Sequence, residues 1–230
     1  MKKNYLTVLS VVLFTNILCA QNLPDVRSAV DFFHISKSIR GELKPTLTEE
    51  DIEGSPYLND EFITGAIYTT SNTKYVDVPL RYNIYNDEVE FDTGNGVQAI
   101  AAPETVDKIE FGDYTMVYVP YSITKKVMRG FFIVKEQGKA SLLIKPEVTF
   151  VQATEPAPYK HAEPAKFDRR ENEYYIWVQK NEAKLISSKN DMVDVFPDNH
   201  DKLEAFIKKN KIKHRQPEDL RKLVQYYNSL

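Results

Sequence analysis

Between Gly65 and Phe150, short runs of β-branched and aromatic residues alternate with tight turns, and this pattern constrains the fold most. The turns, at 71–72, 86–87 and 94–96, are built from Ser, Asn, Asp and Gly, and the Asn and Gly residues tolerate positive φ. Strands this close together favour antiparallel pairing over βαβ units. We predict strands at 66–70, 74–78, 80–85, 88–91, 97–101, 108–111, 115–121, 130–136 and 140–150, with Pro79, Pro120 and Pro146 at strand ends, edges or bulges.

The next segment, residues 152–166, contains three prolines and two copies of Glu-Pro-Ala. This composition predicts an extended, polyproline-like connector. A last hairpin is expected beyond it, with strands at 174–178 and 183–187 and a turn near Lys180-Asn181.

Apolar residues at helical spacing dominate the C-terminal region. We predict one helix capped by Asp198 or Asn199 and a second that begins at Pro217. The predicted fold class is mainly β (α+β). An antiparallel meander over 60–190 forms a sandwich or partial barrel, and short helices follow over 191–230.

The first twenty residues have the layout of a secretory signal peptide. Lys2 and Lys3 precede an apolar run over 6–18, which is shorter than the roughly 20 residues of a membrane-spanning helix. The residues before Cys19 do not fit a lipobox, so we expect cleavage after Ala20 and no lipid anchor. The predicted location is the periplasm or cell envelope, with secretion as the alternative.

Residues 21–59 are predicted to form an N-terminal segment with a short amphipathic helix. Val26, Val30 and Phe33 have helical spacing, and Asp25 is placed to cap them. Thr48, followed by three acids, is a second predicted cap.

Hydrophobic residues make up 42% of the 230 residues, which excludes a disordered or low-complexity chain. The net charge of −3 becomes −5 when Lys2 and Lys3 are removed with the signal peptide, and no cysteine remains for disulfides or thiolate chemistry. Basic residues gather at 208–215. Export argues against nucleic acid as their partner. We expect these residues to pack on the protein's own acidic body, with peripheral membrane contact as the alternative.

Four segments have distinctive sequences: GSPYLNDEF at 54–62, PLRYNIYNDE at 79–88, KASLL at 139–143 and YYNSL at 226–230. In these segments the chain resembles an uncharacterised secreted protein family of the Bacteroidota. The resemblance implies export in a Gram-negative envelope, and it implies no activity and no functional residues.

No motif nominates catalytic, cofactor-binding or metal-binding residues, and we predict none. His200 lies near Asp198 and Asp201, which is better explained as a helix cap than as a metal site. Glu88 and Glu90 are spaced to share one face of a strand, and we interpret that face as solvent-exposed.

Tyrosine is abundant, with 14 residues, and it suits binding surfaces because it combines a large area with one polar group. Our candidate surface is a tyrosine stripe on one sheet face, formed by Tyr68, Tyr82, Tyr85, Tyr118 and Tyr121. The first functional hypothesis is a non-catalytic envelope protein that binds a protein or glycan there. The alternatives are a hydrolase with acidic residues in a barrel mouth and a carrier of an apolar ligand between sheet faces.

Overall fold

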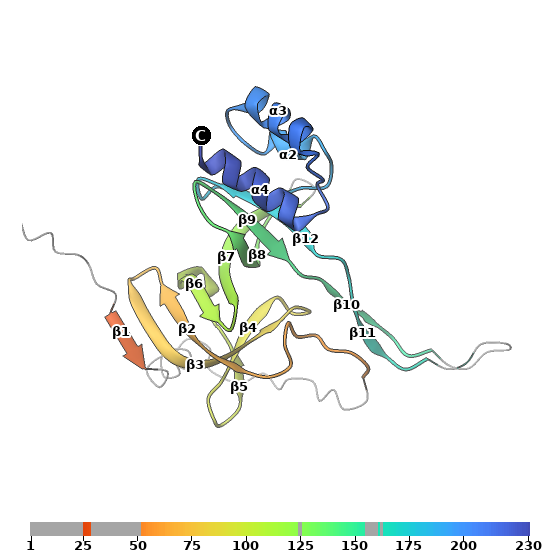
Figure 1. Cartoon of the computed structure of the whole chain (residues 1–230). Coiled ribbons are helices and arrows are strands. Elements are labelled where there is room, and N and C mark those ends of the chain that lie inside the picture. Colours follow the sequence, from red (N-terminus) through yellow and green to blue (C-terminus); the bar gives the residue numbers. More distant parts are fainter. Residues whose placement is uncertain (1–24, 29–51, 124–125, 155–160, 162) are drawn as a thin grey trace, which may run out of the picture.

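The computed structural model describes residues 25–28, 52–123, 126–154, 161 and 163–230, and it is mostly β (Figure 1). The predicted signal peptide, the cap at Thr48 and most of the predicted N-terminal helix lie outside these residues. The strands are β1 (Asp25–Ser28), β2 (Ile63–Thr69), β3 (Thr73–Asn83), β4 (Glu88–Asp92), β5 (Val97–Ala99), β6 (Val106–Phe111), β7 (Tyr114–Ile123), β8 (Lys126–Glu136), β9 (Ala140–Lys145), β10 (Val148–Val151), β11 (Lys166–Arg169), β12 (Glu173–Val178) and β13 (Ala183–Leu185). The helices are a 3-10 turn, η1 (Pro103–Thr105), α2 (Asp191–Asp194), α3 (His200–Asn210) and α4 (Pro217–Asn228).

Most strands join one sheet in the order β13-β12-β9-β8-β7-β6-β2-β3-β4-β5. β13 also pairs in parallel with β7, so β7, β8, β9, β12 and β13 close into a five-stranded ring. The expected class, mainly β with a partial barrel and a short C-terminal helical region, is confirmed. The pairings of β2 with β6 and of β13 with β7 depart from a simple meander.

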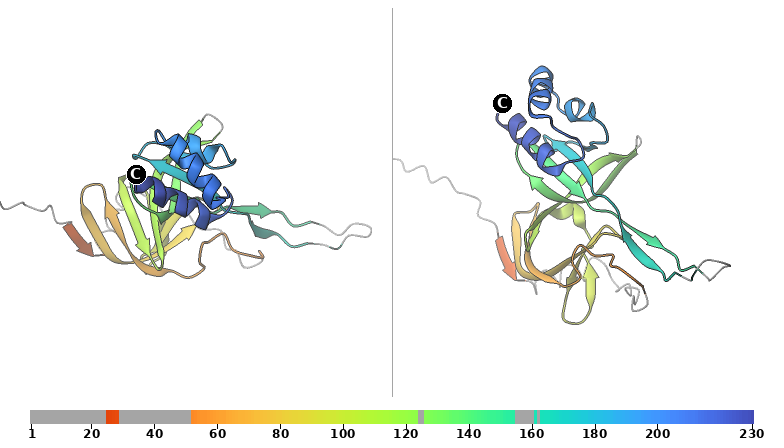
Figure 2. Two further views of the ribbon diagram at one scale, coloured as in Figure 1. Left: turned by 45° about the horizontal axis from the view of Figure 1, so that its top comes forward. Right: turned by 45° about the vertical axis from the view of Figure 1, so that its right-hand side comes forward.

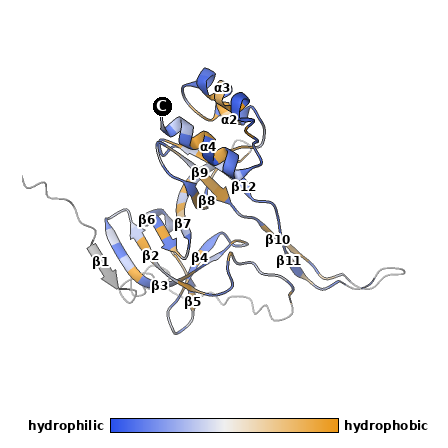
Figure 3. Ribbon diagram, viewed as in Figure 1, coloured by the Kyte–Doolittle hydropathy of each residue, from blue (hydrophilic) through white to orange (hydrophobic). Residues whose placement is uncertain are grey.

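The two long strands β7 and β8 carry a different core on each face. Met116 and Phe131 face the first core, which β2, β3, β4 and β6 complete. Tyr121 and Phe132 face the inside of the ring, where they meet Leu143 and Tyr175. This follows from the two-residue period of a strand, and Figure 3 shows hydrophobic residues concentrated along both strands.

The helices cover the outer face of β9 and β12 and form a helical cap with its own core (Figures 1 and 2). Leu142 and Ile176 point outward from the ring into this core. Leu203 and Ile207 of α3 and the apolar face of α4 fill the rest, with Leu220, Leu223, Val224 and Tyr227 buried.

Proline interrupts β3 less than expected. The strand continues from Thr73 to Asn83 through Pro79, so the two predicted strands at 74–78 and 80–85 are one. On one edge, Pro79 lies opposite Thr64 of β2. On the other edge, among the described residues, β1 pairs with 73–76 and β4 with 80–83, so Pro79 lies in the gap between them.

Two further expectations are corrected. β1 occupies Asp25–Ser28, where the predicted helix was to begin, and pairs in parallel with β3. The described ends of the segment predicted to be a polyproline-like connector pair antiparallel with each other instead, and residues 155–160 and 162 of that segment lie outside the described residues. β10 pairs with β11, and Thr154 bridges Glu163 beyond them. The ribbon projects away from the rest of the molecule (Figure 1).

Arg81 of β3 holds residues 54–62 against the sheet. Its guanidinium carbon lies 3.5 Å from the centre of the Tyr57 ring and 4.4 Å from that of Phe62. Its Nη2 donates to Oε2 of Glu90 at 2.8 Å. The segments GSPYLNDEF and PLRYNIYNDE therefore pack on each other, and we call this contact the N-terminal joint.

Asn228 of α4 fastens the helical cap to the start of β9. Its Oδ1 accepts from the backbone N–H of Ala140 at 2.8 Å, and its Nδ2 donates to the carbonyl of Ala140 at 2.9 Å. Lys139 Nζ lies 4.4 Å from the centre of the Tyr227 ring. The segments KASLL and YYNSL therefore also meet, and we call this contact the C-terminal joint.

Candidate functional site

Three aromatic side chains cluster at the point where the β10–β11 ribbon leaves the sheet. The Tyr85 ring centre lies 6.5 Å from that of Phe150 and 5.3 Å from that of Phe167, and the two phenylalanines are 5.3 Å apart. Tyr85 is 48% exposed and Phe150 is 38% exposed. A contiguous exposed aromatic group of this kind is typical of an interaction site. We call it the aromatic cluster.

Backbone contacts from residues 53–56 hold the cluster in place. Pro56 accepts from the N–H of Ile84 at 2.8 Å, next to Tyr85. Glu53 accepts from the N–H of Phe167 at 2.8 Å. Gly54 has φ +78°, and a Cβ there would collide with the carbonyl oxygen of Phe167, so glycine permits the close approach.

The two edges of the ribbon differ in their pairing among the described residues. The outer edge of β11 takes the bridge between Glu53 and Lys166. Within the part of the chain that the structure describes, β10 pairs only with β11. The other edge of β10, next to Phe150, therefore presents backbone groups to which an extended peptide can add.

The predicted tyrosine stripe does not exist as one exposed surface. Tyr82 is 0% exposed and Tyr121 is 3% exposed, because they fill the first core and the ring interior. Tyr68 and Tyr118 are half-buried, with the Tyr68 hydroxyl donating to Oε2 of Glu110 at 2.8 Å. Only Tyr85 of the five is exposed, and its partners Phe150 and Phe167 were missed.

The acidic pair of β4 is also placed differently from the prediction. Glu90 is 2% exposed rather than solvent-facing. Its two carboxylate oxygens accept from Nη2 of Arg81 at 2.8 Å and from Nδ2 of Asn83 at 3.0 Å. The alternation of residues in β4 predicted one solvent-exposed face, but residues 54–62 and Arg81 cover that face. Glu90 is therefore a structural carboxylate of the N-terminal joint.

Asp87 links the first core to the ring. Its Oδ1 accepts from the hydroxyl of Tyr82 at 2.7 Å, and its Oδ2 pairs with Nζ of Lys145 at 2.9 Å. Burial raises the pKa of Tyr82 well above its ordinary value, and the charge of Asp87 adds to the rise. Tyr82 thus stays a neutral donor at physiological pH. A Cβ at Gly130 would lie 2.5 Å from Oδ2 of Asp87, so this approach requires glycine.

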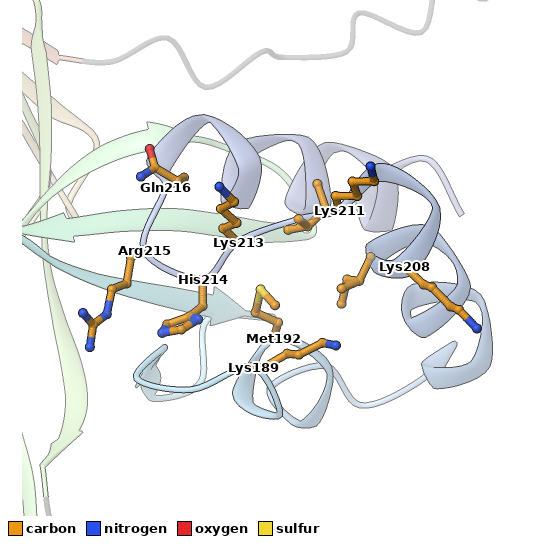
Figure 4. A pocket seen from close by; sticks show the side chains of 10 residues that line it. Lys189, Met192, Lys208, Lys211, Lys213, His214, Arg215 and Gln216 are labelled. Atoms are coloured by element: carbon orange, nitrogen blue, oxygen red, sulfur yellow. The ribbon is translucent and has the colours of Figure 1, made fainter.

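A pocket opens in the helical cap between α2, the end of α3 and the loop before α4, with a volume of about 660 Å³. Met192, Ile207 and Ile212 form its floor and belong to the core of the cap. The remaining lining residues are polar: Lys189, Lys208, Lys211, Lys213, His214, Arg215 and Gln216. In Figure 4, Lys189 lies beside Met192, and the charged ends of Lys208, Lys211 and Arg215 point outward.

The basic residues 208–215 do not pack on the acidic body as predicted. Within the described ranges, none of their side chains forms an ion pair. The lysines and the arginine are exposed, and all of them except Lys209 form one side of the pocket.

His200 begins α3, and its Nε2 lies 2.7 Å from the carbonyl oxygen of Phe196. Asn199 occupies the cap position at φ +62°, in the left-handed region, and makes no side-chain capping bond; its Nδ2 donates to Oδ1 of Asp198. No group of three or more His, Cys, Asp or Glu residues that could hold a metal ion is found among the described residues.

Among the helices of the described residues, none has the length and apolar character needed to cross a membrane. Comparisons with protein-family models, with curated proteins and with solved structures give no match to this chain.

Proposed function

We propose that the protein is an exported, non-catalytic binding protein of the cell envelope that recognises a partner protein through the β10–β11 ribbon. The observation that carries this proposal is the exposed aromatic cluster of Tyr85, Phe150 and Phe167 beside the open edge of β10. The aromatic rings offer anchors, and the edge offers backbone hydrogen bonds to an added strand. The predicted signal peptide supports the location.

The geometry favours a protein over a glycan. The three ring pairs of the cluster are inclined at 63°, 66° and 56°. Rings inclined at these angles present no common flat face for stacking against a sugar. They suit instead the side chains of an added strand, which alternate on and off the ring surface.

The filled interior supports binding at the surface over the two alternatives. Tyr121, Phe132 and Tyr175 occupy the ring interior at T-shaped contacts of 5.0–5.7 Å, where an apolar ligand would have to lie. The carboxylate of Glu90, one of the pair considered for hydrolysis, is engaged by Arg81 and Asn83.

The test is site-specific photocross-linking in cells. A photoreactive phenylalanine analogue replaces Phe150, and, in a matched control, Val127 at the exposed end of the β7–β8 hairpin, which is 59% exposed. We expect a discrete adduct of constant mass from position 150 and none from position 127. The same preparation, fractionated and sequenced from its N-terminus, should yield chains that begin at Gln21 in the envelope fraction.

Competition identifies the kind of partner. The double variant Tyr85→Ser/Phe150→Ser should lose cross-linking from a neighbouring probe at Thr149, whereas Val127→Ser/Met128→Ser should retain it. Adducts that disappear on glycosidase treatment would replace the protein partner with a glycan. Equal labelling at positions 127 and 150 would show that exposed apolar area alone explains the result, and would refute the proposal.

A further inference from the structure

We infer that the pocket in the helical cap binds an anionic amphiphile, meaning a ligand with a phosphate or carboxylate head and an apolar chain. The head would lie among Lys189, Lys211, Lys213 and Arg215, and the chain would lie on the floor of Met192, Ile207 and Ile212. This site is separate from the ribbon, so the inference does not depend on the proposed function.

The first support is the unneutralised positive charge at the rim. Four lysines and one arginine line the pocket, and none of them pairs with an acidic side chain within the described ranges. Elsewhere, Arg81, Lys108, Lys145 and Arg221 each meet a carboxylate. Like charges around a concave, low-dielectric surface focus a positive potential that attracts an anion.

Two acids on the surrounding elements are engaged elsewhere. Asp191 of α2 accepts from the backbone N–H groups of Ser187 and Ser188 and from the Ser187 hydroxyl, at 2.7–2.8 Å. Burial by itself raises the pKa of Asp191, and these hydrogen bonds outweigh it and hold the pKa below its ordinary value. Asp219 of α4 accepts from the backbone N–H of Lys213 and pairs with Lys222. Both carboxylates shape the loops without touching the ammonium groups of the rim.

The helix dipole accounts for only part of this charge. Lys208 lies in the last turn of α3, where a cation offsets the negative end of the helix. Lys189, Lys213 and Arg215 lie outside that turn. Lys211 occupies the C-cap at φ +53°, a left-handed position that usually holds glycine.

The volume and floor specify an amphiphile. A pocket of about 660 Å³ is of the size that holds small organic ligands and is far larger than a bare anion needs. Met192, Ile207 and Ile212 are 0–6% exposed, so an apolar chain would lie over them and against the aliphatic stems of the rim lysines. No Phe, Tyr or Trp lines it, so it lacks the stacking surfaces that single-stranded nucleic acid uses.

The probe is octyl phosphate, added below its micelle concentration to the chain without its predicted signal peptide. The readout is the ¹³C-methyl NMR signal of Met192. Met116, which is 0% exposed, and Met128, on the β7–β8 hairpin, serve as internal references. We expect a saturable shift of Met192 alone, with an affinity at least tenfold higher than for inorganic phosphate or 1-octanol, and weakening with salt. Sedimentation with phosphatidylglycerol and phosphatidylcholine vesicles then distinguishes a membrane lipid from a free amphiphile as the source.

A matched pair of variants tests the charge without risk to the fold. Lys211→Gly removes a rim cation at a left-handed position, and Lys180→Gly does the same at φ +58° in the β12–β13 turn, away from the pocket. Both should keep or raise the melting temperature. Only Lys211→Gly should weaken octyl phosphate binding, by about three- to fivefold for one solvated charge.

Three results would overturn the inference. Octyl phosphate could leave the Met192 signal unmoved, or 1-octanol or inorganic phosphate could bind as tightly as octyl phosphate. An acidic peptide that shifts Met192 at lower concentration than octyl phosphate would assign the pocket to a protein partner instead.

Discussion

At the N-terminal joint a buried ion pair fastens the peripheral segment, whereas at the C-terminal joint a neutral amide does. Arg81 and Glu90 have side chains that are 14% and 3% exposed, with two aromatic rings stacked on the guanidinium. Asn228 makes two uncharged hydrogen bonds to Ala140 and leaves most of the stabilisation to the apolar face of α4. Both joints lie in the segments that carry the resemblance described above.

Because one joint is charged and the other is neutral, we expect their loss to destabilise the fold by different amounts. A buried charge whose partner is removed bears the full desolvation penalty, whereas a lost neutral hydrogen bond leaves only uncharged groups unpaired. Damage to the N-terminal joint should therefore be more severe than damage to the C-terminal joint, although the latter secures the larger element.

Arg81→Ala should have the largest effect, a loss of about 3–5 kcal/mol in the free energy of unfolding, because it leaves Glu90 buried without its cation. Urea denaturation followed by circular dichroism measures it. The double variant Arg81→Met/Glu90→Met should recover most of the loss, since apolar residues of similar volume replace the pair. A loss below about 1 kcal/mol for Arg81→Ala would remove the contrast between the joints.

Asn228→Ala should cost less, about 1–3 kcal/mol, because the N–H and carbonyl groups of the buried Ala140 lose their partners. The same denaturation series measures it, with Ser229→Ala as the exposed neighbouring control. A cost equal to that of Arg81→Ala would contradict the ranking.

Gly138→Ala should cost about 1 kcal/mol, because the new Cβ would lie 2.6 Å from Cγ of Asn228 and displace the amide. In the Asn228→Ala background the clash is absent, so the substitution should be neutral or slightly stabilising. A double-mutant cycle gives this coupling directly. Additive effects of the two substitutions would show that the amide of Asn228 does not move.

Glu147→Gln, outside both joints, should have the smallest effect and depend on pH. Burial raises the pKa of Glu147, and the charge of Glu173 adds to the rise. A raised acid pKa favours the folded state below the unfolded pKa and loses that contribution as pH rises through the folded pKa. The variant should therefore melt slightly higher than wild type near pH 7 and alike below about pH 4. Thermal melts across this range measure the difference, and a constant offset at every pH would contradict it.

Turn chemistry and period-two patterning in the sequence placed most strands, including β4 over Glu88–Asp92 and the hairpin turn at Lys180-Asn181. They could not place pairs distant in sequence, such as β13 with β7, because such pairing depends on how the sheet closes. The alternation of residues in β4 also placed Glu90 on a solvent-exposed face. The sequence around Glu90 does not show that Arg81 of β3 pairs with it and covers it.

The candidate sites were predicted even less completely. Tyr85 was named, yet Phe150 and Phe167 join it only because β10 and β11 pair with each other, and the prolines between these strands suggested an extended connector. The basic residues 208–215 were identified, but their pocket needs Lys189 and Met192 from before and within α2. A run of charged residues can be read from the sequence, whereas a pocket depends on how distant segments pack.

Strands β7 and β8 contribute one face to each of two cores, and this affects how the chain folds. One face of each strand belongs to the first core and the other face to the ring. Removing either of these two halves of the sheet would therefore expose apolar residues of the other to water. The hairpin is local in sequence, so it can form early and template both halves. The two halves should then unfold in a single transition, and the amides of Met116 and Phe132 should be among the last to exchange with deuterium.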